Sequence, residues 1–186
     1  AMTEGERFEE ALANLAAVFQ EQRIRYALIG GLAVSVWGTP RATEDIDVLA
    51  DAGPSPELDA ALRAAGFESE WRRGDSDDPV PLLLRLRGAS GPEIDVICVT
   101  REWEREMLTR SVHVRIPTGL EIPVTAVEDL LVLKLIAGGP RNLADVAEIL
   151  ERAGSLPELE KRAKERGVSE LLRQIKTSSK NQPRSE

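Results

Sequence analysis

Hydrophobic positions recur with two different periods along the chain. Between residues 4 and 22 apolar side chains return every three or four positions, at Phe8, Leu12, Leu15 and Phe19, which predicts an amphipathic helix. Short apolar or alternating segments bounded by glycine and proline predict strands; these lie at 24–29, 46–50, 82–87, 93–99, 112–116 and 120–122. The remaining patterns predict helices at 32–37, 56–65, 102–109, 125–137 and, in several pieces, from Pro140 to about Lys176.

The order of these elements divides the chain into an α+β part and a helical part. Strands and helices mix as far as Val124, so we expect a core of residues 1–124 that holds a mixed sheet flanked by helices. Only helices follow, which predicts a short C-terminal helical unit at 125–176, opened by a capping box of Thr125 and Glu128. The polar segment 68–80 is predicted to be irregular and mobile with room for one short strand, and 177–186 is predicted to be disordered.

Composition and charge exclude several classes of protein. The longest apolar runs are too short to span a bilayer and the N-terminal residues do not resemble an export signal, so no membrane association is expected. A single cysteine, Cys98, excludes a disulfide framework and favours a reducing cytoplasmic location. The net charge is −8, with a net +5 on residues 161–186 and −13 on the rest. An acidic body of this kind repels nucleic-acid backbones, so a polyanionic ligand needs metal ions or a local basic patch.

Two aspartates in a predicted strand are the first candidates for chemistry. Asp45 and Asp47 lie two positions apart, so both carboxylates point to the same face, while Ile46 and Val48 point to the other. Two neighbouring carboxylates repel each other unless a cation lies between them. By itself this pattern is most often a solvated strand end.

A third aspartate strengthens the metal interpretation. Asp95 lies among isoleucine and valine residues in the predicted strand 93–99, where a carboxylate is costly to bury unless it is paired or binds a metal. If this strand neighbours the Asp45 strand, three carboxylates converge and suit two Mg²⁺ ions. The alternative is that Asp95 simply begins its strand after the turn at Gly91 and Pro92.

A pair of glycines supplies a candidate phosphate site. Gly30 and Gly31 end a predicted strand and precede a helix, where backbone amides can bind a phosphate that approaches closely. No Gly-Lys-Ser/Thr follows, so this is not a Walker loop. The only histidine, His113, lies in a predicted strand, and Cys98 is expected to be inert core.

Together these motifs resemble a known family. Ile29-Gly30-Gly31, Asp45-Ile46-Asp47-Val48 and Ile94-Asp95-Val96 are similar to the signature of the nucleotidyltransferase superfamily with the DNA polymerase beta-like fold. The segments 129–135 and 140–146 resemble the C-terminal helical motifs of its small bacterial branch, which is related to the nucleotidyltransferase toxins of type IV abortive-infection systems. The resemblance covers about residues 20–150.

The resemblance implies a role for each matching position. Asp45 and Asp47 would bind both metal ions, Mg²⁺ or Mn²⁺, and Asp95 would complete the second site and help to activate the acceptor hydroxyl. The residues expected to bind the nucleotide, ATP or another NTP, are Gly30, Gly31, Arg41, Thr43 and Lys134. Lys134 lies on an apolar helix face and needs an anionic partner, unless its aliphatic stem lets the amine reach solvent.

The chain also departs from the family pattern. Relatives commonly carry serine in place of Gly31, arginine in place of Gly139 and aspartate in place of Asn142. The expected activity is transfer of a nucleoside monophosphate from an NTP to a hydroxyl of an RNA end, a protein or a small molecule, with pyrophosphate release and a possible antitoxin partner. Two alternatives remain open: a non-catalytic module that binds a nucleotide or a protein, and an antibiotic-modifying nucleotidyltransferase.

Overall fold

The chain forms two compact units, each with its own packing. The computed structural model describes residues 2–40, 42–75, 77–116 and 119–180. The first unit, here the sheet unit, consists of the residues up to Leu32 together with Ala42–Thr125. The second, here the helical unit, contains residues 33–40 and 126–180 of the described chain. The predicted boundary at Val124 therefore falls next to one of the divisions, but residues 33–40 were not expected to join the helices.

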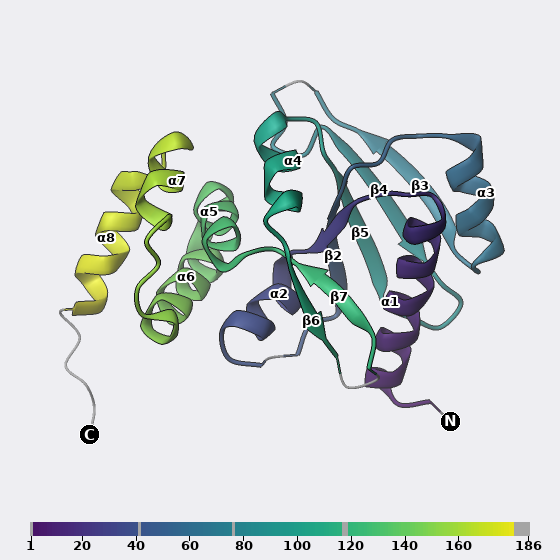
Figure 1. Cartoon of the computed structure of the whole chain (residues 1–186), viewed down its shortest axis with the longest axis horizontal. Coiled ribbons are helices and arrows are strands. Elements are labelled where there is room, and N and C mark those ends of the chain that lie inside the picture. The colour runs from purple at the N-terminus through teal and green to yellow at the C-terminus, as the bar shows by residue number, and fades with distance from the viewer. Residues whose placement is uncertain (1, 41, 76, 117–118, 181–186) are drawn as a thin grey trace. The chain divides into compact units, whose positions relative to one another are not determined.

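A seven-stranded mixed sheet forms the centre of the sheet unit (Figure 1). Its strands are β1 (Tyr26–Leu28), β2 (Asp45–Ala50), β3 (Glu68–Arg73), β4 (Leu82–Arg87), β5 (Glu93–Cys98), β6 (Val112–Arg115) and β7 (Glu121–Val124). The order across the sheet is β3-β4-β5-β2-β1-β7-β6. The pairs β2–β5 and β1–β7 are parallel and the other neighbours are antiparallel. The predicted α+β class and mixed sheet are confirmed.

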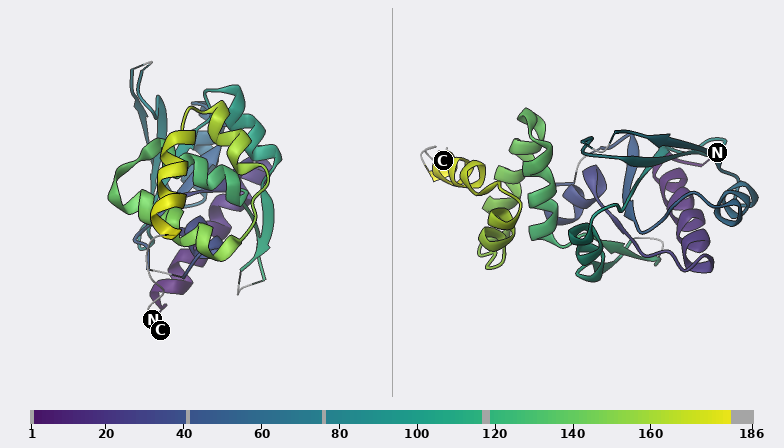
Figure 2. Two further views of the ribbon diagram at one scale, coloured as in Figure 1. Left: turned by 90° about the vertical axis from the view of Figure 1, so that its left-hand side faces the viewer. Right: turned by 90° about the horizontal axis from the view of Figure 1, so that it is seen from above.

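The two faces of this sheet differ in burial. Ile46, Val48, Ile94 and Val96 are fully buried, whereas the residues that alternate with them in β2 and β5 are mostly exposed or half-buried. The helices α1 (Glu4–Glu21) and α3 (Pro56–Ala64) lie on the same side of the sheet in two views (Figures 1 and 2). The buried side chains of β2, β4 and β5 therefore point to the side that these helices cover. The side chains between them point to the opposite side of the sheet, here called the open face.

The helical unit is built mainly from α5 (Val127–Ala137), α6 (Gly139–Ala153), α7 (Leu159–Glu165) and α8 (Ser169–Lys180). Helix α2 (Gly30–Trp37) begins in the sheet unit and ends in the helical unit. The segment after it is bound by α6: Glu148 accepts the backbone N–H of Thr39 at 2.7 Å, and Arg152 donates to the Thr39 hydroxyl at 2.7 Å. Residues 33–40 are thus held to the helices by direct polar contacts as well as by packing.

Several details of the secondary structure differ from the sequence-based expectation. The capping box predicted for Thr125 and Glu128 is wrong, because Thr125 donates its backbone N–H to Leu28 and so continues the β1–β7 pairing, which makes Ala126 the cap of α5. The segment after Glu68 forms the regular strand β3, which pairs with β4 over its whole length. Helix α8 runs to Lys180, so residues 177–180 are helical, while 181–186 lie outside the described residues.

The remaining helix of the sheet unit, α4 (Glu102–Thr109), was predicted at its observed bounds. Within the described parts of the chain, every helix is too short or too polar to cross a lipid bilayer.

Candidate functional site

The three predicted aspartates lie on the open face. Strands β2 and β5 are parallel neighbours, and their register places Asp47 opposite Asp95 and Asp45 opposite Glu93. Neighbouring strands are about 4.8 Å apart, and positions two apart share a face. The condition stated for the metal hypothesis, that the Asp95 strand neighbours the Asp45 strand, is therefore met, and a fourth carboxylate, Glu93, joins the group.

Gly30 is required by the side chain of Asp47. The backbone N–H of Ile29 donates to the Asp47 carbonyl at 3.0 Å, which brings the first residue of α2 beside this aspartate. Gly30 has a φ of +62°, and a Cβ atom there would overlap the Asp47 carboxylate, with 2.7 Å to its Cγ atom. Both the backbone conformation and the close approach therefore demand glycine at this position.

Thr43 links the second glycine to Asp45. Its hydroxyl donates to the Asp45 carboxylate at 3.1 Å. A Cβ atom on Gly31 would lie 2.8 Å from the same hydroxyl oxygen, so the threonine hydroxyl occupies the space that a side chain at Gly31 would need. Gly30, Gly31 and Thr43 are thus gathered around the two aspartates of β2. Arg41, the other residue predicted next to these aspartates, lies outside the described residues.

An arginine that the sequence analysis did not single out binds Asp95. Arg85 on β4 lies opposite Asp95 in the register and donates Nε and Nη2 to its two carboxylate oxygens, both at 2.8 Å. Each side chain is only about one-fifth exposed, 20% for Arg85 and 21% for Asp95. This bidentate pair is the main cause of a raised pKa at Arg85. A signal was present in the sequence, since Arg85 and Arg87 alternate with leucines and so share one face of their strand.

The pair belongs to a ladder of charges that crosses the open face. Arg85 Nε also lies 3.0 Å from Glu93, and Arg87 contacts both Glu93, at 2.8 Å, and Glu70, at 3.4 Å. Arg72 closes the ladder on the edge strand by its own contact with Glu70. Opposite charges therefore alternate from the aspartates to the edge of the sheet.

Lys134 has the anionic partner that its position required. Its amine lies 2.9 Å from Asp145 and donates to the amide oxygen of Asn142 at 3.0 Å. Lys134 is 12% exposed and Asp145 3% exposed, so the pair is largely shielded from water. Asn142 in turn donates its amide N–H to the Gly138 carbonyl at 2.8 Å. All of these residues belong to the helical unit, and the predicted contact of Lys134 with a nucleotide stays a prediction.

The donor set on the open face suits a hard divalent cation. It consists of carboxylates alone, since Cys98 is buried on the covered side of β5 and His113 lies in β6 beside Pro123. Across the ranges that the structure describes, no three acidic, histidine or cysteine side chains are already grouped as a metal site. The engagement of both Asp95 oxygens by Arg85 gives a physical reason for that.

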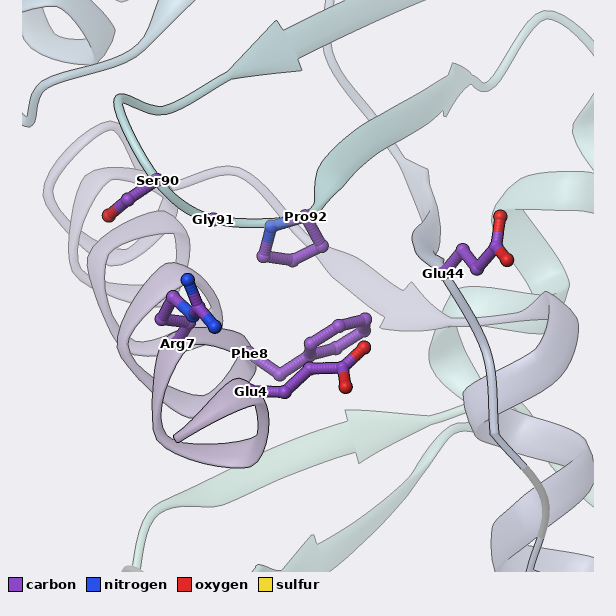
Figure 3. Close-up of a pocket in the computed structure, with 7 residues that line it drawn as sticks. All are labelled: Glu4, Arg7, Phe8, Glu44, Ser90, Gly91 and Pro92. Carbon is purple, nitrogen blue, oxygen red and sulfur yellow. The ribbon is translucent and has the colours of Figure 1, made fainter. Parts of the chain in front are cut away.

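A cavity in the sheet unit lies elsewhere. It has a volume of about 250 Å³ and is formed by the start of α1, Glu44 and the β4–β5 turn (Figure 3). Arg7 and Phe8 of α1 line it together with Gly91 and Pro92 of the turn. The cavity is therefore on the covered side and does not contain the three aspartates.

A family match identifies the class of protein to which the chain belongs. The chain matches the family described as nucleotidyl transferase AbiEii toxin, type IV TA system, over residues 10–183. It belongs to this family and is a nucleotidyltransferase, as the motifs predicted.

Solved structures of low identity share the fold. A nucleotidyltransferase-like protein from Paracoccidioides brasiliensis is 18% identical, with a TM-score of 0.58 over 95% of this chain and 94% of the other. The structure of ANT(2″)-Ia in complex with adenylyl-2″-tobramycin is 12% identical, with a TM-score of 0.53 over 90% of this chain and 96% of the other. A putative nucleotidyltransferase from Thermotoga maritima is 16% identical, with a TM-score of 0.51 over 70% of this chain and 86% of the other. No curated protein matches the chain.

Proposed function

We propose that this nucleotidyltransferase is metal-dependent and transfers a nucleoside monophosphate from an NTP, such as ATP, to a hydroxyl group, with release of pyrophosphate. The observation that carries the proposal is the register of β2 and β5, which sets Asp47 against Asp95 on the open face with Asp45 two residues away. Asp45 and Asp47 lie two positions apart on one face of β2, where their carboxylates repel each other, and a divalent cation offsets that repulsion. The family supports the type of reaction.

The carboxylates would hold Mg²⁺ or Mn²⁺. Asp45 and Asp47 would bind both ions and Asp95 would complete the second site. Bound there, the metal ions would neutralise charge on the attacking and leaving oxygens of an in-line displacement. Asp95 would also accept a hydrogen bond from the acceptor hydroxyl, which would orient the hydroxyl oxygen toward the α-phosphorus. That oxygen would form a bond to the α-phosphorus while its proton passes to Asp95, and the bond from the α-phosphorus to the bridging oxygen would break, so that pyrophosphate leaves.

The turn between β1 and α2 would hold the triphosphate. Helix α2 begins at Gly30, and backbone amides at a helix start would bind phosphate oxygens there. Thr43 holds the Asp45 carboxylate by its hydroxyl, and this contact fixes the edge of the site. We assign Arg41 and Lys134 to the same ligand, as the family resemblance implies.

The family supports an antitoxin partner and leaves the class of acceptor open. Membership of a type IV toxin family supports a toxin role that an antitoxin opposes. A hydroxyl of an RNA end, a protein or a small molecule fits the chemistry, and the strongly acidic residues 1–160 favour an acceptor that is not a long polyanion.

Ligand-dependent unfolding and transfer test the proposal together. The wild type is heated with Mg²⁺ or Mn²⁺ and each NTP, and label from α-³²P-NTP is followed into candidate acceptors. A ligand at a hundred times its dissociation constant stabilises by about 2.7 kcal/mol, which raises the melting temperature by about 5–10 °C. Asp47→Asn is expected to lose both the shift and the transfer while remaining folded.

Asp51→Asn is the matched control. Asp51 follows β2 and binds Arg25 at 3.1 Å on the surface, so its loss should leave the shift and the transfer unchanged. Transfer that persists in Asp47→Asn would refute the site assignment. The absence of any NTP-dependent shift in the wild type would refute nucleotide binding.

A further inference from the structure

Arg85 is shared between two carboxylates that have different places in the site. It binds both oxygens of Asp95 at 2.8 Å, and its Nε atom is also 3.0 Å from Glu93 Oε1. Asp95 lies opposite Asp47, whereas Glu93 is two positions nearer the start of β5. Arg85 therefore has a second acceptor within hydrogen-bond distance.

This arrangement makes Arg85 a competitor for Asp95. A bidentate guanidinium occupies both oxygens of a carboxylate, which are the same atoms that a metal ion needs. The positive charge of Arg85 also repels a divalent cation at short range. Metal binding at Asp95 consequently requires that Arg85 release at least one oxygen.

We propose that Arg85 is a positioning residue that sets the metal affinity of Asp95, with Glu93 as the acceptor to which it transfers. In the metal-free protein Arg85 neutralises Asp95; when a divalent cation takes the Asp95 oxygens, Arg85 moves fully onto Glu93. The inference rests on the proposed metal dependence of the site. It goes beyond that proposal because it gives functions to Arg85 and Glu93. It also makes the metal affinity of the second site depend on which carboxylate Arg85 binds.

The ladder provides a matched control in Arg87. This arginine is on the same strand and face, is bound to Glu93 at 2.8 Å, and makes no contact with Asp95 in the described structure. If the ladder of charges is purely structural, Arg85→Met and Arg87→Met should have similar effects, because both would only lower the stability of the β3–β4–β5 sheet. A competing Arg85 predicts that only its own replacement changes metal binding.

The experiment measures binding of Mn²⁺ alone, by the electron paramagnetic resonance signal of the free ion, to the full chain. The variants are Arg85→Met, Arg87→Met, Glu93→Gln and the double variant Arg85→Met/Glu93→Gln, with Asp45→Asn to identify binding at the site. Thermal unfolding in EDTA reports the stability of each. Glu93→Gln keeps Arg85 in place, so it tests the proposal even if Arg85→Met is poorly folded.

We expect Arg85→Met to lower the Mn²⁺ dissociation constant about tenfold, and Arg87→Met to leave it within about twofold. Glu93→Gln should weaken binding, because Arg85 then has Asp95 as its only carboxylate partner of the two. The double variant should match Arg85→Met, since Glu93 acts only through Arg85.

Equal Mn²⁺ affinity in the wild type and Arg85→Met overturns this inference and leaves the proposed function intact. So does an equal gain in Arg87→Met. If neither the wild type nor Arg85→Met shows binding that depends on Asp45, both proposals are overturned.

Discussion

At the scale of single residues, the site depends on the absence of a side chain at Gly30 as well as on the carboxylates of the aspartates. Gly30 has a positive φ and lies against the Asp47 carboxylate, so any side chain there would displace the aspartate that faces Asp95. The sequence indicated the glycine pair and the aspartates. It did not indicate that the glycine is needed by the aspartate, because that contact depends on how β1 and β2 align.

Gly30→Ala is expected to abolish nucleotidyl transfer while costing only about 1–2 kcal/mol of unfolding free energy for the left-handed backbone. The overlap moves Asp47, so the loss of activity should exceed what the stability change explains. Gly66→Ala is the control, since Gly66 also has a positive φ but open space around it. Transfer assays and thermal unfolding of both variants check the prediction, and a Gly30→Ala variant as active as Gly66→Ala would contradict it.

At the scale of elements, α5 and α6 are joined by a polar cluster inside their contact. Asn142 uses both ends of its amide: the oxygen accepts from Lys134, and the N–H donates to the Gly138 carbonyl at the helix junction. An aspartate at this position could not make the second bond because an ionised carboxylate only accepts. In this cluster Lys134 therefore has Asp145 as its carboxylate partner, and Asn142 ties the lysine to the helix junction.

Asp145→Asn is expected to lower the free energy of unfolding by about 3 kcal/mol, because it leaves the amine of Lys134 shielded from water without its carboxylate. Glu170→Gln is the control: Glu170 pairs with Arg173 on the exposed surface of α8, where such pairs contribute less than about 1 kcal/mol. Urea unfolding of the two variants measures the difference. Equal effects would contradict the view that the α5–α6 pair stabilises the helical unit.

At the scale of the whole molecule, the sequence predicted most elements but not all of their neighbours. Periodicity placed β2 and β5 within a residue or two, and the β4–β5 hairpin was visible from its Gly-Pro turn. The sequence left the pairing of β2 with β5 as a condition of the metal hypothesis, because strands far apart in the chain leave no local signal of their pairing. The partner of Asp95 was missed for a similar reason: Arg85 had a predictable face, but a salt bridge also needs the register.

The division of the chain into units was only partly predictable. A change from mixed to purely helical elements marked Val124, whereas residues 33–40 join the helices through contacts such as those of Thr39 with Glu148 and Arg152. The chain thus passes between the units three times. Ala33 and Val34, which belong to the helical unit although they precede most of the sheet, are essentially fully buried.

Cleavage of the folded chain between Thr125 and Ala126 by a protease site inserted there should not separate the two pieces. Residues 33–40 remain packed in the helical unit although they belong to the first piece, so the nicked protein is expected to elute as one species in size-exclusion chromatography. Denaturant should release two fragments. Separation under native conditions would show that the contacts of residues 33–40 are too weak to hold the unit together.

The same interleaving limits how such a protein can be recombined. An exchange of the C-terminal helices with those of a relative, made by a single crossover after Thr125, would leave residues 33–40 facing surfaces that they were not selected to fit. A viable chimera must carry two inserts, the second half of α2 with its following turn and the helices from α5 onward. Sequence changes in these two stretches should therefore be inherited together, although most of the sheet unit, Ala42–Thr125, lies between them in the chain.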